Sequence, residues 1–108
     1  MAVPVRLQPV ARRDLDEAYQ LAAHHAPLTA ANWLQRFHET VETLGENPER
    51  CALIPESKKL RRELRQLLFG RKPNVFRIIY AIHDDELEVI RIRRASRGPL
   101  KRSDLDES

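Results

Sequence analysis

The spacing of apolar residues changes along the chain, and this change constrains the fold more than any other feature. Between residues 30 and 44 apolar side chains recur every three or four positions, which predicts a helix with one buried face. The residues of this stripe are Ala30, Trp33, Leu34, Phe37, Val41 and Leu44. Residues 75–82 are instead almost continuously apolar and rich in β-branched and aromatic types, which predicts a strand. The two periodicities together predict an α+β fold.

A second amphipathic helix precedes the one just described. Pro9 suits the first turn of a helix, and the apolar positions that follow it keep helical spacing up to a stop at residues 24–27. Thr29 is the predicted N-cap of the second helix, which we expect to end around Gly45 and Pro48. Because the connection is short, the two helices should form an antiparallel hairpin.

Four segments have the pattern of strands. Residues 3–7 alternate between apolar and polar types and include Pro4, which predicts an edge strand. Residues 48–63 are interpreted as a connector. Further strands are expected over 64–69, 75–82 and 87–93, the last two joined by a polar turn at 83–86. The order is β-α-α-β-β-β, with the helical hairpin on one face of a mainly antiparallel four-stranded sheet, and the first strand must insert beside a later one.

Length and composition place this arrangement in one domain. We assign residues 1–100 to it and expect 101–108 to be a flexible tail with little apolar content. Cys51 is the single cysteine, so an internal disulfide is excluded, and no histidine spacing is typical of a metal site. We expect no metal and no cofactor. Neither a secretory signal nor an apolar run of about 20 residues occurs, so we expect a soluble, cytoplasmic protein without a membrane contact.

Positive charge is concentrated in the second half of the chain. Residues 58–102 hold 14 of the 19 lysines and arginines but only five acidic residues. Ten of these 14 cations are arginines, whose planar guanidinium groups suit phosphates and carboxylates. This bias favours an anionic partner, either nucleic acid or an acidic protein segment, although a solvated basic face has the same composition.

Arg77 is unusual because it interrupts the most apolar strand. A charge at this position must face water, a partner or a compensating acid. A two-residue turn at Asp84 and Asp85 pairs residue 77 with residue 92, which places Arg77 on the face opposite to Arg91 and Arg93. One extra residue in the hairpin reverses this facing, so the sequence leaves the two alternatives open.

Known catalytic sets are missing. His83 and Tyr80 lie on or beside a strand, and neither has an evident partner for acid–base chemistry. Arg50 stands next to Cys51 and favours the thiolate, but a lone cysteine without a placed base is more often a small buried group.

Several motifs, in this order and spacing, resemble the RelE/ParE superfamily of type II toxin–antitoxin modules. They extend over about residues 3–100 and comprise Ala11-x-x-Asp14-Leu15, Ala31-Asn32-Trp33-Leu34-x-x-Phe37, Asn47-Pro48-x-Arg50-Cys51, Ile54-Pro55-Glu56, Leu64-Arg65-Gln66-Leu67-Leu68-x-Gly70-Arg71, Phe76-Arg77-Ile78-Ile79-Tyr80 and Ile92-Arg93-x-x-x-Arg97. The resemblance implies a small bacterial toxin with the β-α-α-β-β-β arrangement. It also implies a cognate antitoxin whose extended C-terminal segment wraps the toxin, in a heterotetramer or a larger complex. Candidate antitoxin-binding residues are Tyr19, Trp33, Phe37, Leu64 and Phe76.

The two branches of the superfamily differ in their target. The RelE branch cuts mRNA on the ribosome, and the resemblance places Arg65, Arg77 and Arg97 at positions of its phosphate ligands. This chain departs from that pattern, because Leu67 stands at a lysine position and no tyrosine follows Arg97.

The ParE branch inhibits DNA gyrase and needs no nuclease set, so we favour a gyrase-directed inhibitor over an enzyme. Candidate target- or phosphate-binding residues are Arg71, Arg91, Arg93 and Arg94. A ribosome-dependent endoribonuclease and a non-toxic, degenerate binding module remain as alternatives.

Overall fold

The helices and strands follow the expected order, with two short additions. The structure is a computed structural model and describes residues 2–105. Its elements are β1 (Val5–Leu7), α1 (Pro9–His25), α2 (Pro27–Glu46), α3 (Glu56–Leu60), β2 (Arg65–Arg71), β3 (Asn74–His83), β4 (Glu86–Arg94) and the 3-10 turn η1 (Arg102–Leu105). The β-α-α-β-β-β order is confirmed, and the additions are α3, inside the expected connector, and η1.

Both long helices begin at a proline. Pro9 and Pro27 occupy first-turn positions, where the missing N–H costs nothing and the fixed φ suits a helix. The predicted N-cap at Thr29 is wrong, because α2 begins two residues earlier, at Pro27. Ala26 is its N-cap, and the carbonyl of Ala26 accepts the Ala30 N–H at 2.9 Å.

The sheet has the strand order β1-β4-β3-β2. β2, β3 and β4 are antiparallel neighbours, while β1 pairs with β4 in parallel, with Val5 opposite Leu87. The expected insertion of the first strand beside a later one is therefore confirmed. The segment that leads into β1 is held as well, because the Val3 N–H donates to the carbonyl of Gly45 in α2 at 2.8 Å.

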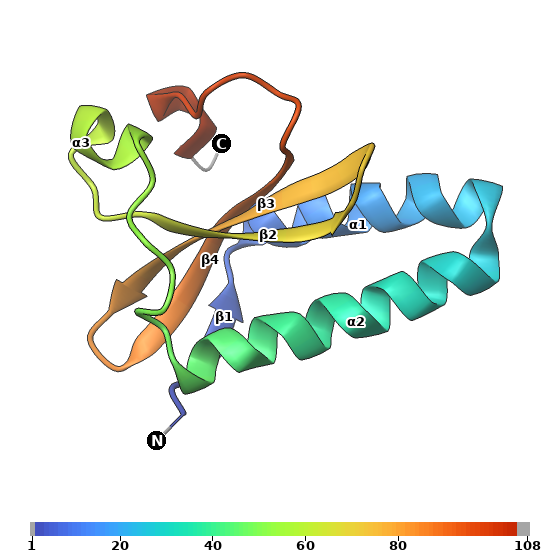
Figure 1. Ribbon diagram of the computed structural model, residues 1–108, viewed down its shortest axis with the longest axis horizontal. Coiled ribbons are helices and arrows are strands. Elements are labelled where there is room, and N and C mark those ends of the chain that lie inside the picture. Colours follow the sequence, from blue (N-terminus) through green and yellow to red (C-terminus); the bar gives the residue numbers. More distant parts are fainter. Residues whose placement is uncertain (1, 106–108) are drawn as a thin grey trace.

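The two faces of the sheet bury separate cores. The helical hairpin covers one face, and α3 and the C-terminal segment lie over the other (Figure 1). Phe37, Leu44 and Tyr80 are among the fully buried residues of the helix-side core. Leu64 and Ile90 belong to the smaller core under α3, together with Leu100 from the C-terminal segment.

The face of the sheet on which Arg77 lies is set by the pairing of β3 with β4 within the hairpin and not by the length of its turn. The two-residue turn is present, since His83 pairs with Glu86, and Asp84 has the positive φ of 48° that such turns require. A register shift between Ile79 and Tyr80 then adds one residue on β4. Arg77 consequently pairs with Arg93 and not with residue 92, so both point to the same face.

The C-terminal segment returns to the sheet. Leu100 is buried, and η1 contacts β4. Of the expected tail, 102–105 thus forms a turn, and 106–108 lie outside the described residues. Among residues 2–105, no helix is long and apolar enough to cross a membrane.

Candidate functional site

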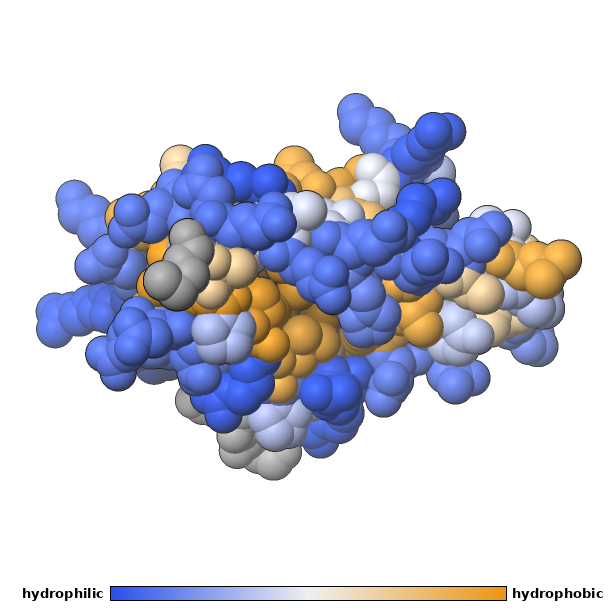
Figure 2. Space-filling model, turned by 90° about the horizontal axis from the view of Figure 1, so that it is seen from below, coloured by the Kyte–Doolittle hydropathy of each residue, from blue (hydrophilic) through white to orange (hydrophobic). Residues whose placement is uncertain are grey.

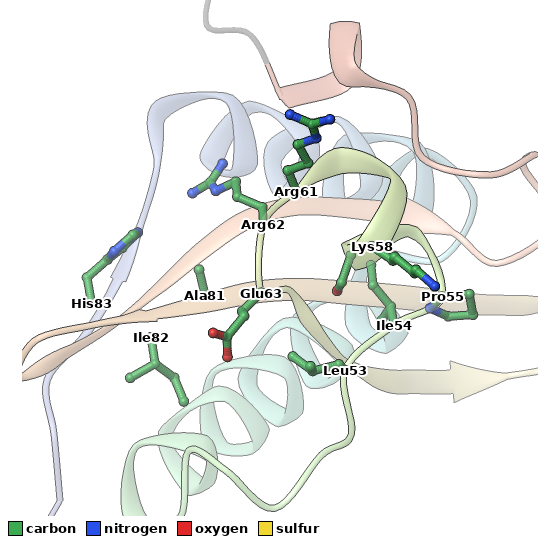
Figure 3. Close-up of a pocket in the computed structure, with 11 residues that line it drawn as sticks. Leu53, Ile54, Pro55, Lys58, Arg61, Arg62, Glu63, Ala81, Ile82 and His83 are labelled. Atoms are coloured by element: carbon green, nitrogen blue, oxygen red, sulfur yellow. The ribbon is translucent and has the colours of Figure 1, made fainter.

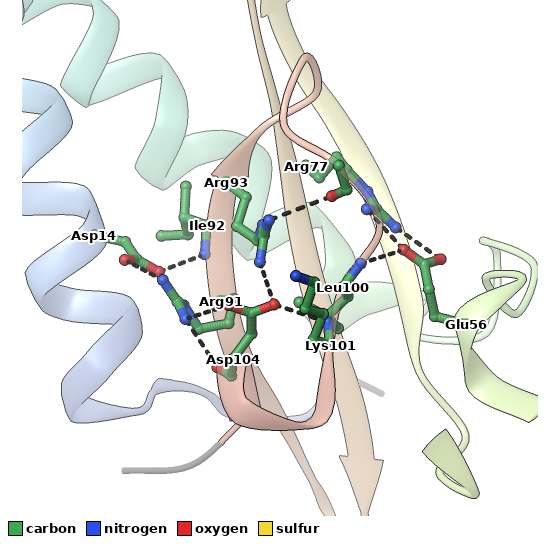
Figure 4. Close-up of polar contacts among 10 residues, drawn as sticks. Asp14, Glu56, Arg77, Arg91, Ile92, Arg93, Leu100, Lys101 and Asp104 are labelled. Atoms are coloured by element: carbon green, nitrogen blue, oxygen red, sulfur yellow. Dashed lines mark hydrogen bonds and ion pairs between the residues drawn. The ribbon is translucent and has the colours of Figure 1, made fainter. Parts of the chain in front are cut away.

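Three arginines on the α3 face of the sheet are each bound by a carboxylate of the same chain. Figure 4 shows Arg77, Arg91 and Arg93 with acidic partners from α1, from α3 and from the C-terminal segment. The partners are Asp14, Glu56 and Asp104. The charges of these three arginines are therefore balanced inside the fold.

Arg77 is held by two neighbouring elements. Its Nη1 lies 2.9 Å from Oε2 of Glu56, and its Nε donates to the side-chain oxygen of Gln66 on β2. Both side chains of the ion pair are only 12% exposed. Burial alone raises the pKa of Glu56, but the hydrogen bonds from Arg77 and from the Leu100 N–H outweigh it and lower this pKa to about 2.

Arg91 connects the first helix to the C-terminal turn. Its Nε lies 2.7 Å from Oδ2 of Asp14, and its Nη1 donates to the carbonyl of Asp104 at 2.8 Å. The same Asp14 oxygen accepts the Ile92 N–H at 3.0 Å, which caps an edge of β4 that has no strand beside it. The hydrogen bond to Asp14 raises the pKa of Arg91 above its ordinary value.

Arg93 is the most buried of the three. Its side chain is 5% exposed, and its Nη1 lies 2.6 Å from Oδ2 of Asp104. Burial opposes the charged form of Asp104, yet the Lys101 N–H and Arg93 together lower the pKa of this carboxyl group. Asp104 therefore remains ionised and fixes η1 to the sheet.

The remaining nuclease candidates do not converge with Arg77. Arg65 donates to the carbonyl of Cys51, in the connector. Arg97 is exposed and lines a groove bordered by α1 and α2, and none of the hydrogen bonds or ion pairs described for residues 2–105 joins it to Arg77. Tyr80 is fully buried, its hydroxyl donates to the carbonyl of Pro48 at 2.8 Å, and burial raises its pKa above the ordinary value. Acid–base chemistry by Tyr80 is therefore disfavoured.

A groove opens where the helical hairpin passes the ends of β3 and β4, and we call it the α1–α2 groove. It has a volume of about 560 Å³. Its apolar wall includes Leu21, Ala22, Trp33 and Phe76, and Arg94 and Arg97 lie at its rim. Figure 2 shows a band of apolar surface between polar margins, which reaches the hairpin end of the molecule. Leu21 is 56% exposed and Leu28 is 84% exposed, so large apolar side chains at this end face solvent.

Trp33 is the centre of an aromatic cluster beside the groove. Its ring centroid lies 5.6 Å from those of Phe69 and Phe76, and 5.9 Å from that of Phe37. Arg94 is fixed over the outer side of Phe76, at 6.0 Å from the ring centroid. Trp33 and Phe76 are thus packed against each other in the apolar wall of the groove.

The five candidate antitoxin-binding residues thus separate by exposure. Trp33 and Phe76 line the groove and are partly accessible, whereas Tyr19 is half-buried and lies outside the lining. Phe37 and Leu64 are fully buried in the two cores, so neither offers surface to a partner. The structure therefore removes these two residues from the candidate surface. Arg71, at the end of β2, is exposed.

The acidic partners are the residues that the sequence interpretation missed. Asp14 entered the sequence interpretation only as part of a motif, yet it shares an inward helical face with Ala11 and Ala18. An acid on an apolar stripe is a detectable signal for a buried ion pair. Glu56 and Asp104 carry no comparable signal, because their partners lie far away in the sequence. Among residues 2–105, no group of three or more His, Cys, Asp or Glu side chains is arranged to hold a metal ion.

Comparison with solved structures finds a chain with the same fold. A chain titled "Chromosomal ParDE TA system from P. aeruginosa" superposes with a TM-score of 0.67 at 22% identity, covering 86% of this chain and 96% of that one. At this identity the likeness establishes the fold. No curated protein sequence matches this chain.

The family follows from the sequence itself. A family model described as "ParE toxin of type II toxin-antitoxin system, parDE" matches residues 5–99. The chain belongs to this family of ParE toxins, and the resemblance to the RelE/ParE superfamily is confirmed.

Proposed function

We propose that this toxin acts in the cytoplasm as a protein inhibitor of DNA gyrase, without nuclease chemistry, and that a cognate antitoxin neutralises it. The observation that carries the proposal is the internal pairing of the sheet arginines. Arg77, which would bind phosphate in a RelE-like nuclease, already has a buried carboxylate 2.9 Å away. Opening this pair would leave a buried charge without a partner, which makes a phosphate site at this position costly.

The lack of a suitable proton acceptor and proton donor beside Arg77, among the residues considered for a nuclease, supports the same proposal. Cleavage of RNA requires a group that removes a proton and a group that donates one. The phenol of Tyr80 is buried and donates to a backbone carbonyl, and Arg65 and Arg97 make no hydrogen bond or ion pair with Arg77 in the described part of the chain. Membership of the ParE family adds support, since its branch of the superfamily is the one that the resemblance associates with gyrase.

The α1–α2 groove is the site that we propose for the antitoxin. An amphipathic helix or an extended segment with apolar anchors suits a groove of this volume, and Trp33 and Phe76 supply aromatic walls. Arg94 and Arg97 at the rim suit acidic side chains that flank the anchors. The complex is proposed to be a heterotetramer or larger.

The test is a comparison of two target assays with the same toxin preparation. We expect the protein to inhibit gyrase supercoiling, and we expect added antitoxin to restore the activity. Ribosome-bound mRNA should remain uncut in a primer-extension assay. Supercoiling that continues at saturating toxin would refute the gyrase proposal, and codon-positioned cuts would establish the nuclease alternative. If neither activity occurs and cells tolerate overexpression, the degenerate binding module is the correct description.

A further inference from the structure

A second hollow lies on the α3 face of the sheet, away from the α1–α2 groove. We call it the α3 hollow and define it by Leu53, Ile54, Lys58, Arg62, Ala81 and Ile82. Its volume is about 740 Å³, and it lies between the segment around α3 and the last residues of β3 (Figure 3). The sheet arginines described above take no part in it.

The hollow borders a strand edge that has no neighbour. β2 begins at Arg65, which pairs with Tyr80, whereas β3 continues to His83. Residues 81–83 therefore pair with β4 on one side and with no strand on the other, within the described part of the chain. The backbone of Leu64 does not close this edge, because its N–H and carbonyl are bonded to Ser57 and Ile54. An extended peptide can add to an edge of this kind.

The side chains around this edge favour an acidic peptide. Lys58, Arg61 and Arg62 line the hollow together with a single acidic residue, Glu63, and none of the ion pairs among residues 2–105 involves any of these four. These free cations contrast with Arg77, Arg91 and Arg93, whose charges are balanced by carboxylates. Apolar surface from Leu53, which is 46% exposed, lies beside them.

We infer that the α3 hollow binds an extended acidic segment of the target protein, which adds as a strand beside residues 81–83. Alternate apolar side chains of the segment contact Leu53 and Ile82 on the helix side of the sheet, and its carboxylates, on the α3 side, face Lys58 and Arg62. The inference rests on the proposed role of the chain as a protein-directed inhibitor. It assigns the target and the antitoxin to different faces of the toxin, so neutralisation does not require both ligands to compete for one groove.

The first experiment measures peptide binding without gyrase. A fluorescein-labelled peptide in which glutamate alternates with isoleucine is titrated into the purified full-length toxin and followed by anisotropy. We expect binding that is lost when lysine replaces glutamate, and also when alternate amides of the peptide are N-methylated. Equal binding of the N-methylated peptide would refute strand addition. Binding of a single-stranded oligonucleotide in place of the peptide would refute the peptide as the ligand.

Two variants localise the site. Lys58→Glu/Arg62→Glu should weaken peptide binding by about tenfold or more, while Arg12→Glu/Arg13→Glu, an exposed pair on α1, should leave it unchanged. Antitoxin affinity and melting temperature serve as controls for folding. If Lys58→Glu/Arg62→Glu retains full affinity for the peptide, the inference is overturned.

A gyrase assay then separates the two proposals. If wild-type toxin inhibits supercoiling and Lys58→Glu/Arg62→Glu loses this inhibition, both proposals stand. If the wild type binds the peptide but does not affect gyrase, the gyrase assignment fails while the peptide site remains. If Lys58→Glu/Arg62→Glu inhibits gyrase as well as the wild type does, the α3 hollow is not the site that binds the target protein.

Discussion

The ion pair between Arg77 and Glu56 joins three parts of the chain that are distant in sequence. Arg77 lies on β3, Glu56 is the first residue of α3, and the same carboxylate accepts the N–H of Leu100 at 3.0 Å. A residue that the superfamily pattern marks as a phosphate ligand therefore serves here as a structural anchor for α3 and for the C-terminal segment.

Glu56→Gln should destabilise the protein by about 2–3 kcal/mol, because it leaves the Arg77 charge largely buried without a carboxylate. Urea unfolding followed by circular dichroism measures this change. Glu49→Gln is the matched control, since Glu49 is exposed and forms no ion pair in the described structure. A Glu56→Gln variant as stable as the control would show that the pair contributes little.

Lowering the pH should reduce the free energy of unfolding through the carboxyl group of Glu56. The pKa of Glu56 is about 2 in the folded protein, against an ordinary 4.5, so its contribution is fully present above pH 4.5. It is lost as the pH falls from 4.5 toward 2. The free energy of unfolding, measured from pH 7 to pH 2.5, should decline more steeply for the wild type than for Glu56→Gln. Parallel pH profiles would contradict the lowered pKa.

Gly45→Ala should destabilise the protein even though alanine favours helices. A Cβ at residue 45 would lie 2.6 Å from the carbonyl oxygen of Val3, so β1 would have to move away from α2. We expect a loss of about 1–3 kcal/mol, as for other overpacked sites. Thermal melting measures it, and Gly98→Ala, where no atom lies within 4 Å of the added Cβ, is the control. Equal melting temperatures would show that β1 adapts without cost.

Leu21→Asp tests the proposed antitoxin site with little risk to folding. Leu21 lines the α1–α2 groove and is 56% exposed, so the substitution should change stability by less than about 0.5 kcal/mol. Antitoxin affinity should fall by about tenfold or more, because an apolar contact is replaced by a charge. Isothermal titration calorimetry gives the affinity. Gln20→Asp, on the neighbouring exposed position of α1, should bind like the wild type. Unchanged affinity in Leu21→Asp would place the antitoxin elsewhere.

The local elements were accessible from the sequence, since their signals come from nearby residues. Helical spacing around Phe37 indicated α2, and the β-branched run around Ile79 indicated β3. The start of α2 was misplaced because Thr29 is a good N-cap residue, yet Pro27 already fixes a first-turn conformation. α3 was missed because five residues give too short a pattern to detect.

The sequence by itself determined the β-α-α-β-β-β order, the polar turn at residues 83–86 and the family, all of which depend on local patterns. The tertiary structure alone decided which face Arg77 occupies and which acids neutralise it. The register shift between Ile79 and Tyr80 turns Arg77 toward Glu56, and folding brings the C-terminal segment over the same face. Such pairings depend on packing between residues far apart in the chain, and local periodicity carries no information about them.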